Sequence, residues 1–157
     1  MKTPRLACVL AGSALILFLL AGIARAAETC EPVVGSLVTV EGRVEVQRTG
    51  RGAWTPAVLD QALCQGDLVR AGQRSRATVQ LVNQAVLRID QNTAMRLDRI
   101  TDKKEERSSL GLLRGAMQSF SRKPRSFEVS TPYLNGSIEG TEFVFRVENN
   151  ASELIVI

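Results

Sequence analysis

Cys30 and Cys64 are the residues whose chemistry is most clearly defined by the sequence. The third cysteine, Cys8, lies in an apolar N-terminal run, so the other two form an even pair in the polar part of the chain. In an oxidising compartment such a pair forms a disulfide more often than a metal site, and closing a loop of this length stabilises a fold by about 3 to 4 kcal/mol in the chain-entropy model. Two free buried thiols are the alternative, because the sequence does not show how close the two Cα atoms come.

Residues for catalysis are largely missing. The chain has no histidine, which excludes Ser-His and Cys-His nucleophile pairs. A zinc site would need more ligands than two cysteines and scattered carboxylates. Glu105 and Glu106 are the only adjacent acidic residues, and they lie beside two lysines, which gives a glycosidase pair little support. We therefore expect no enzymatic activity, no cofactor and no metal.

Arginines are the first candidates for binding. Five of them share the sequence parity opposite to the apolar residues, so in extended structure they would line one exposed face. They are Arg70, Arg74, Arg76, Arg88 and Arg96. Such a strip could dock an acidic partner or an anionic polymer of the cell envelope. The alternative is a soluble surface of weak salt bridges, since Asp90 and Asp98 share this parity.

Trp54, the only tryptophan, is the second candidate for binding. Beside Pro56 it could be a platform for sugar stacking or protein docking, because an indole ring combines a large apolar face with a polar edge. A lone tryptophan is more often a plug in the core, and both interpretations stay open.

The N-terminus decides the compartment in which these residues act. Lys2 and Arg5 precede an uncharged, largely apolar run at 6–23, and a small-residue processing pattern follows at 24–26. We expect residues 1–26 to be a secretory signal peptide; an uncleaved anchor is the alternative, since about 18 apolar residues can just cross a bilayer. The positive charges before the apolar run place the rest of the chain outside the cytoplasm, in the periplasm.

Signal removal also lowers the net charge. The whole chain has 20 Lys+Arg against 16 Asp+Glu, and three basic residues leave with the signal peptide. The mature chain then carries 17 basic and 16 acidic residues, a net charge of +1. We therefore do not expect nucleic acid as a partner.

Hydrophobic alternation predicts an all-β mature chain. The even positions between 34 and 46 are apolar or small, which predicts one long strand or two strands bent at Gly42. Most odd positions between 77 and 89 are apolar in the same way, and the pattern resumes at 93, 95 and 97 after the polar pair at 91–92. Polar pairs separate these short strands every eight to twelve residues or so. We expect a single domain of antiparallel strands over 34–157, of sandwich, barrel or solenoid type, after a linker at 27–33.

The remaining stretches are less regular. Residues 57–66 could form a helical turn, 101–109 are interpreted as a charged loop and 122–125 as a turn. Glycines in 110–120 predict a strand with a bulge or sharp bend. Asn135-Gly136 is a preferred pair for a type I′ reversal, which predicts a hairpin there.

The order of these motifs resembles the FecR domain, an extracytoplasmic β-rich domain named after regulators of iron-dicitrate transport. The resemblance rests on Gly-Arg-Val-Glu-Val at 42–46 and on three residue pairs, which it implies to be structural. These are Gly66-Asp67, Thr131-Pro132 and Gly140-Thr141. The resemblance implies an all-β fold, an envelope location and a part in signal transduction.

Both ends of the chain qualify this resemblance. Relatives that regulate sigma factors carry a cytoplasmic helical domain before a membrane helix, whereas only a few residues precede the apolar run here, so sigma-factor binding is not implied. At the other end, the apolar run at 154–157 has no turn or polar cap after it. This predicts a domain truncated at its C-terminus; a genuine terminus with a buried edge strand is the alternative.

We therefore predict an exported, non-enzymatic domain that acts as a protein-binding or sensory module in bacterial envelope signalling, with an envelope protein as its partner. The alternative is a structural module, or one that binds carbohydrate such as peptidoglycan or another polysaccharide. Membrane contact is expected only through the N-terminal segment, if this segment stays uncleaved.

Overall fold

The computed structural model describes residues 30–103 and 106–157. In these ranges eleven strands form one antiparallel sheet and no residue is helical, which confirms the predicted all-β fold. Accordingly, the described part of the chain contains no helix suited to span a membrane. The predicted signal peptide lies outside the described residues, as do positions 27–29 of the predicted linker.

Most strands are short, and only β9 and β10 exceed ten residues. The strands are β1 (Val33–Glu41), β2 (Val44–Gln47), β3 (Trp54–Pro56), β4 (Ala62–Cys64), β5 (Leu68–Ala71), β6 (Arg76–Leu81), β7 (Val86–Ile89), β8 (Ala94–Arg99), β9 (Ser108–Ser130), β10 (Asn135–Glu148) and β11 (Ala151–Val156).

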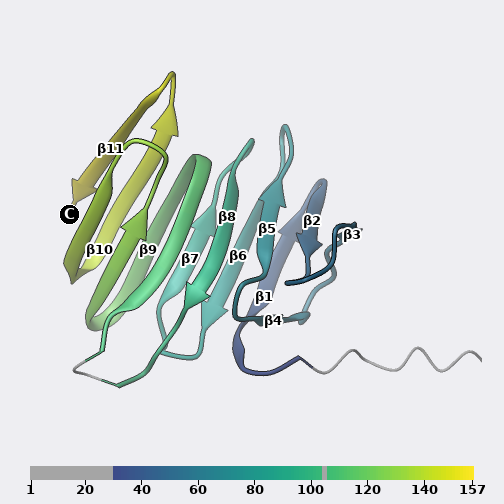
Figure 1. Ribbon diagram of the computed structural model, residues 1–157, viewed down its shortest axis with the longest axis horizontal. Coiled ribbons are helices and arrows are strands. Elements are labelled where there is room, and N and C mark those ends of the chain that lie inside the picture. The colour runs from purple at the N-terminus through teal and green to yellow at the C-terminus, as the bar shows by residue number, and fades with distance from the viewer. Residues whose placement is uncertain (1–29, 104–105) are drawn as a thin grey trace, which may run out of the picture.

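The sheet folds back on itself at β9 (Figure 1). Its strand order is β3-β2-β5-β8-β9-β7-β6-β1-β4, with β10 paired to β9 and β11 to β10. The first part of β9, up to Arg114, pairs with β8, and the part from Met117 to Phe120 pairs with β7. We call β3, β2, β5 and β8 the β5 layer, and β4, β1, β6, β7, β10 and β11 the β7 layer; β9 belongs to both.

Gly115 forms the corner at which β9 passes from one layer to the other. Its φ of +85° is a backbone conformation that favours glycine. A Cβ at this position would also lie only 2.5 Å from the Cα of Thr93, so a larger residue would clash. The Thr93 hydroxyl accepts a hydrogen bond from the N–H of Ala116 at 3.0 Å and fixes the corner. The bend predicted in 110–120 is therefore confirmed.

The core fills the space between the two layers. The odd positions that alternation predicts as apolar are all buried, with at most 2% of any residue exposed. They are Ala77, Val79, Leu81, Ala85, Leu87, Ile89, Thr93, Met95 and Leu97. Phe127, Phe143 and Phe145 extend this core under β9 and β10 in edge-to-face contacts, with ring centroids 5.5 and 6.0 Å apart.

The predicted alternation is wrong within β1. Leu37 is fully buried and Val38 is 39% exposed, the opposite of the even-position pattern. The cause is a bulge between Leu37 and Thr39 in the pairing of β1 with β6, which shifts the side-chain phase by one residue. Further on, the chain turns at Gly42, which has a φ of +72°, so the alternative of two strands bent at this glycine is confirmed.

The hairpin after β9 forms, but its reversal is not at the predicted Asn135-Gly136 pair. Both residues already belong to β10, where Gly136 pairs with Val129. The turn lies at 131–134 instead, because the Thr131 hydroxyl accepts a hydrogen bond from the N–H of Leu134 at 2.9 Å. Gly136 is needed for packing, since a Cβ there would lie 2.7 Å from the ring of Phe145.

Three of the irregular stretches differ from their interpretation. Residues 57–66 contain β4 and no helical turn, and the charged loop ends at Ser108, where β9 begins. Residues 122–125 are not a turn, because they lie within β9. Their pairing with β10 is nevertheless interrupted: Phe120 pairs with Glu142 and Arg125 with Gly140, so residues 121–124 arch out opposite Thr141 alone.

Candidate functional site

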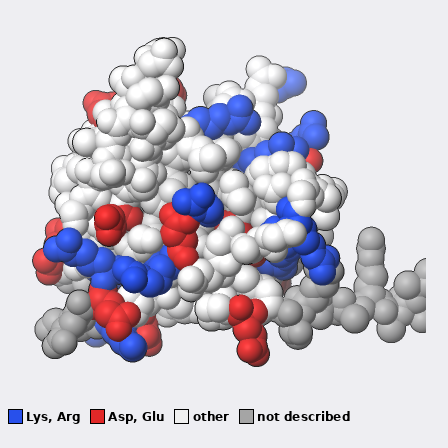
Figure 2. Space-filling model, viewed as in Figure 1, with Lys and Arg blue, Asp and Glu red and all other residues white. Residues whose placement is uncertain are grey.

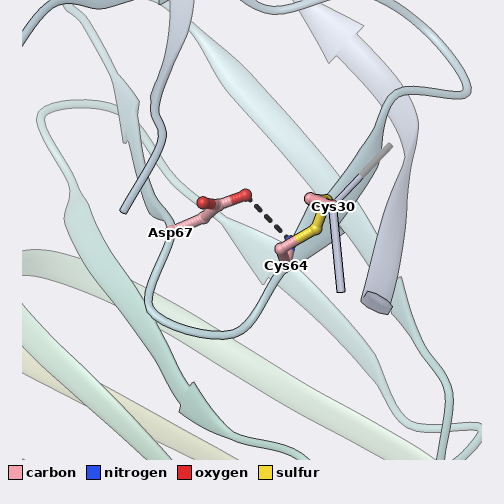
Figure 3. A group of neighbouring side chains, drawn as sticks. All are labelled: Cys30, Cys64 and Asp67. Atoms are coloured by element: carbon pink, nitrogen blue, oxygen red, sulfur yellow. Dashed lines mark hydrogen bonds between the residues drawn. A yellow bond between two sulfur atoms is a disulfide. The ribbon is translucent and has the colours of Figure 1, made fainter. Parts of the chain in front are cut away.

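The structure contains the predicted disulfide between Cys30 and Cys64, with the two Cα atoms 5.9 Å apart (Figure 3). The bond ties the chain ahead of β1 to β4, at the point where the chain leaves the β7 layer. The Asp67 carboxylate lies within 4.8 Å of both sulfurs. Because both sulfurs belong to the disulfide, they offer no thiolate with which Asp67 could hold a metal.

Asp67 is instead the acceptor of a buried hydrogen-bond network. It is 1% exposed and accepts hydrogen bonds from the backbone N–H of Cys64 at 2.8 Å and of Thr49 at 3.1 Å, and from the guanidinium of Arg48. The preceding Gly66 has a φ of +85° and leaves room for Thr49. The Gly66-Asp67 pair thus anchors the loop after β2 to the start of β5, which is a structural task.

The other two pairs named from the resemblance lie at irregular points of the pairing between β9 and β10. Thr131 closes the turn after β9 with its hydroxyl, and Pro132 lies within this turn. Gly140 and Thr141 lie where the register between β9 and β10 shifts. All three pairs therefore bend or join strands in the part of the chain that the structure describes.

Trp54 lies on β3 at the edge of the sheet and is neither buried nor fully exposed. The guanidinium carbon of Arg70 lies 4.1 Å from the ring centroid, a cation–π contact that covers one face of the indole. Arg70 also donates from Nε to Glu45 at 2.7 Å. This hydrogen bond, and a weaker one from Arg43, hold the pKa of Glu45 below its ordinary value despite partial desolvation.

The five predicted arginines do not form one strip, because the two layers lie back to back. Arg70 and Arg96 lie on neighbouring strands of the β5 layer, and Arg96 is paired with Asp98, which raises the pKa of this arginine. The remaining three lie on the β7 layer or in the turn that leads into it. They are Arg74, Arg76 and Arg88. Figure 2 shows basic and acidic side chains interspersed on the face in view rather than gathered in a continuous band.

Arg76 and Arg88 line a depression of about 370 Å³ on the outer face of the β7 layer. Arg146 of β10 lies on the same rim, and Val144 contributes apolar surface. The pairing register explains this arrangement, since β7, β9 and β10 are consecutive in the sheet.

The charges around this depression are unevenly matched. Arg76 pairs with Asp90 at 3.1 Å, and Arg146 approaches Glu153 at 3.8 Å. A backbone hydrogen bond from Gln91, together with Arg76, lowers the pKa of Asp90 below its ordinary value. Arg88 has no carboxylate within 4.0 Å in the described part of the chain. The depression therefore has an excess of positive charge.

The sequence analysis did not predict a second basic group on the same face. Arg122 and Lys123 lie on the arched part of β9 and Arg125 directly follows it; all three line a depression of about 300 Å³ beside Phe120. The signal available in the sequence is three basic residues within four positions, a stretch that the sequence analysis interprets as a turn. In the folded chain Pro124 lies where the pairing with β10 is interrupted.

Comparison with known proteins identifies the family. The family model described as FecR protein matches residues 67–157, more than half of the chain. Neither the curated proteins nor the solved structures contain a match to this chain. The matched range runs from Asp67 through β5 to β11 and includes both basic depressions. FecR domains lie outside the cytoplasm and act in signalling at the cell envelope, and this chain belongs to the FecR family.

Proposed function

We propose that this chain is an exported FecR-type domain that acts as a protein-binding or sensory module in periplasmic signalling. Family membership supports a protein partner in general terms. The observation that carries the more specific proposal is the basic depression lined by Arg76, Arg88 and Arg146. We propose that it docks an acidic segment of the partner.

The composition of the depression fits such a segment. Arg88 has its guanidinium exposed and without a carboxylate among the described residues, so it can offer both edges of its donor fork to a partner. The half-buried side chain of Val144 would meet an apolar residue of the same segment. The position on a rigid, paired region of the sheet would hold the basic groups in place without loop ordering.

An exported location is part of this proposal. The disulfide between Cys30 and Cys64 supports it, because such bonds persist in oxidising compartments. The signal-like composition of residues 1–26 supports it as well. We propose cleavage after residue 26; an uncleaved segment would instead tether the domain to the membrane.

The rival function, a carbohydrate-binding module, has less support at Trp54. Arg70 covers one face of the indole and leaves only the other for a sugar ring. On this surface a sugar would have to compete with an intramolecular cation–π contact or bind to a single face.

Charge reversal in the depression tests the proposal. The exported chain, purified from the periplasm with its disulfide intact, is used to capture partners from envelope extract, and a partner identified by mass spectrometry is purified and titrated against the variants. We expect Arg76→Glu/Arg88→Glu to weaken binding at least tenfold. Arg99→Glu/Arg107→Glu, with the same change in net charge at two exposed arginines elsewhere, is expected to bind like the wild type. Equal loss in both variants would indicate a general charge effect, and no loss in either would exclude docking at this depression.

A further inference from the structure

The arched part of β9 forms a basic depression whose charges the rest of the described chain leaves unmatched. Its lining combines the basic residues of the arch with residues of β6, β7 and the turn between them. None of the lining residues is acidic. No carboxylate of the described residues lies within 4.0 Å of Arg122, Lys123 or Arg125. Three like charges therefore lie close together, an arrangement that an anion would relieve.

The arch is held open by local interactions. Residues 121–124 have only Thr141 opposite them on β10, so they leave the regular ladder. The buried hydroxyl of Ser121 donates to the carbonyl oxygen of Lys123 at 2.7 Å and fixes the bend. Pro124 has no N–H to restore the pairing. The basic side chains are thus presented by a preformed backbone shape.

Arg125 gives a second, independent sign of a missing partner. Its Nε is buried from solvent and has no hydrogen-bond acceptor. A buried charged donor without an acceptor is unfavourable and uncommon in folded proteins. Glu139 lines a neighbouring depression together with Arg125, but it does not come within ion-pair distance of the guanidinium. Because Arg125 lines the depression, its uncompensated charge adds to the attraction for an anion bound at the arch.

The opposite wall of the depression has the features of a sugar site. Phe120 is 45% exposed and lies next to Val86 through direct cross-strand pairing, which makes a flat apolar platform. The amide of Gln80 makes only long hydrogen bonds of 3.4 Å, and the side chain of Gln84 makes none within the described structure. Amide groups can both donate to and accept from sugar hydroxyls. An aromatic face with a few polar groups at its rim is the usual composition of a small-ligand pocket.

From these features we infer that the depression binds a saccharide that carries a phosphate group. The phosphate lies at Arg122 and Lys123 with Arg125 behind them, the sugar ring lies on Phe120, and its hydroxyls reach Gln80 and Gln84. A volume of about 300 Å³ suits one or two sugar units better than a folded partner. This site uses none of the arginines of the docking proposal, so each proposal can fail without the other.

The test is a titration of the exported, disulfide-bonded chain followed by heteronuclear NMR. Glucose 6-phosphate is the probe, with glucose and inorganic phosphate as separate arms. We expect shifts confined to the depression, including the Arg125 Nε–H signal, and at least tenfold tighter binding of glucose 6-phosphate than of glucose or phosphate alone.

Two variants and a control sharpen the test. Arg122→Gln/Lys123→Gln is expected to weaken binding of glucose 6-phosphate at least tenfold. Phe120→Ala should lower the affinity for glucose 6-phosphate to that for inorganic phosphate. Arg99→Gln/Arg107→Gln is expected to bind like the wild type, and the spectra themselves report whether each variant is folded. Absence of confined shifts would overturn the inference, as would equal affinity for inorganic phosphate, or tighter binding of a glutamate-rich peptide at the same residues.

Discussion

The outer faces of the two layers use their basic side chains differently. On the β5 layer, Arg70 and Arg96 each pair with a carboxylate. On the β7 layer, Arg76 and Arg146 also pair with carboxylates. Arg88, Arg122 and Lys123 of the same layer, in contrast, have no carboxylate within 4.0 Å among the described residues. Both faces lie on the same folded sheet, so the difference comes from the side chains and not from the type of backbone.

This difference separates residues that maintain the fold from residues that are free to bind. A guanidinium already satisfied by a carboxylate and an aromatic ring gains little from a ligand, because binding would first break these contacts. An exposed cation without a partner loses only hydration when an anion arrives. Removing a residue from the paired group should therefore lower stability, whereas removing one from the unpaired group should weaken binding without lowering stability.

The largest effect is expected at Asp67. Asp67→Ala removes the acceptor of three hydrogen bonds and leaves the guanidinium of Arg48, only 17% exposed, without its partner. Breaking a buried ion pair from one side costs about 3 to 5 kcal/mol. Urea unfolding followed by fluorescence would measure this loss.

Asp90→Ala is the matched control, since it removes an ion-paired aspartate that is 51% exposed at its side chain. We expect this variant to lose less than about 1 kcal/mol. Similar losses in both variants would mean that burial does not distinguish the two regions.

The disulfide should have the next largest effect. Cys30→Ser/Cys64→Ser opens a loop with a sequence separation of 34 and should lower the free energy of unfolding by about 3 to 4 kcal/mol in the chain-entropy model. The wild type in reducing buffer should lose the same amount, which is measured in the same urea experiment. An unchanged midpoint would show that β4 and the start of β5 are held by the Asp67 network alone.

Arg70→Gln tests the paired face of the β5 layer. It removes the cation–π contact with Trp54, worth about 0.5 to 1 kcal/mol, and the hydrogen bond to Glu45. Arg88→Gln, which changes an exposed arginine of the β7 layer, should leave stability unchanged within about 0.5 kcal/mol. Equal losses would contradict the distinction between the two faces.

The same variant has a pH signature. The lowered pKa of Glu45 means that its contribution to stability is fully present above its ordinary value of 4.5 and is lost as the pH falls through the folded-state pKa. The difference in unfolding free energy between wild type and Arg70→Gln should therefore shrink as the pH is lowered from 7 through this range. A constant difference would show that the cation–π contact alone accounts for the effect.

Side-chain parity predicted the core well because it depends only on neighbouring residues. Every odd position between 77 and 97 that was expected to be apolar is buried, and the two-residue period requires no knowledge of the partner strands. The prediction failed where pairing with another strand decides the phase. The bulge after Leu37 and the arch at 121–124 both depend on the register with a strand distant in sequence.

The arrangement of the binding residues was less accessible for the same reason. Side-chain parity predicts that the arginines lie outside the core, but it does not predict the order of the strands in the sheet. β8 pairs with β9 before the corner at Gly115 and β7 pairs with it after the corner, which puts Arg88 and Arg96 on opposite layers. The family motif, in contrast, was readable from Gly66-Asp67 and Gly140-Thr141, because motifs preserve order along the chain and need no three-dimensional information.

The smallest effect, and the one with the opposite sign, is expected at the arch. Arg122→Gln/Lys123→Gln removes two neighbouring positive charges that have no carboxylate close by in the described structure, so repulsion with Arg125 falls and no favourable contact is lost. The free energy of unfolding should rise by about 0.2 to 0.5 kcal/mol, and this gain should disappear in high salt, where exposed charges are screened. Urea unfolding at low and high ionic strength measures both effects. A loss of stability at low salt would mean that these side chains maintain the fold as Arg70 does, and the unpaired residues would then resemble the paired ones.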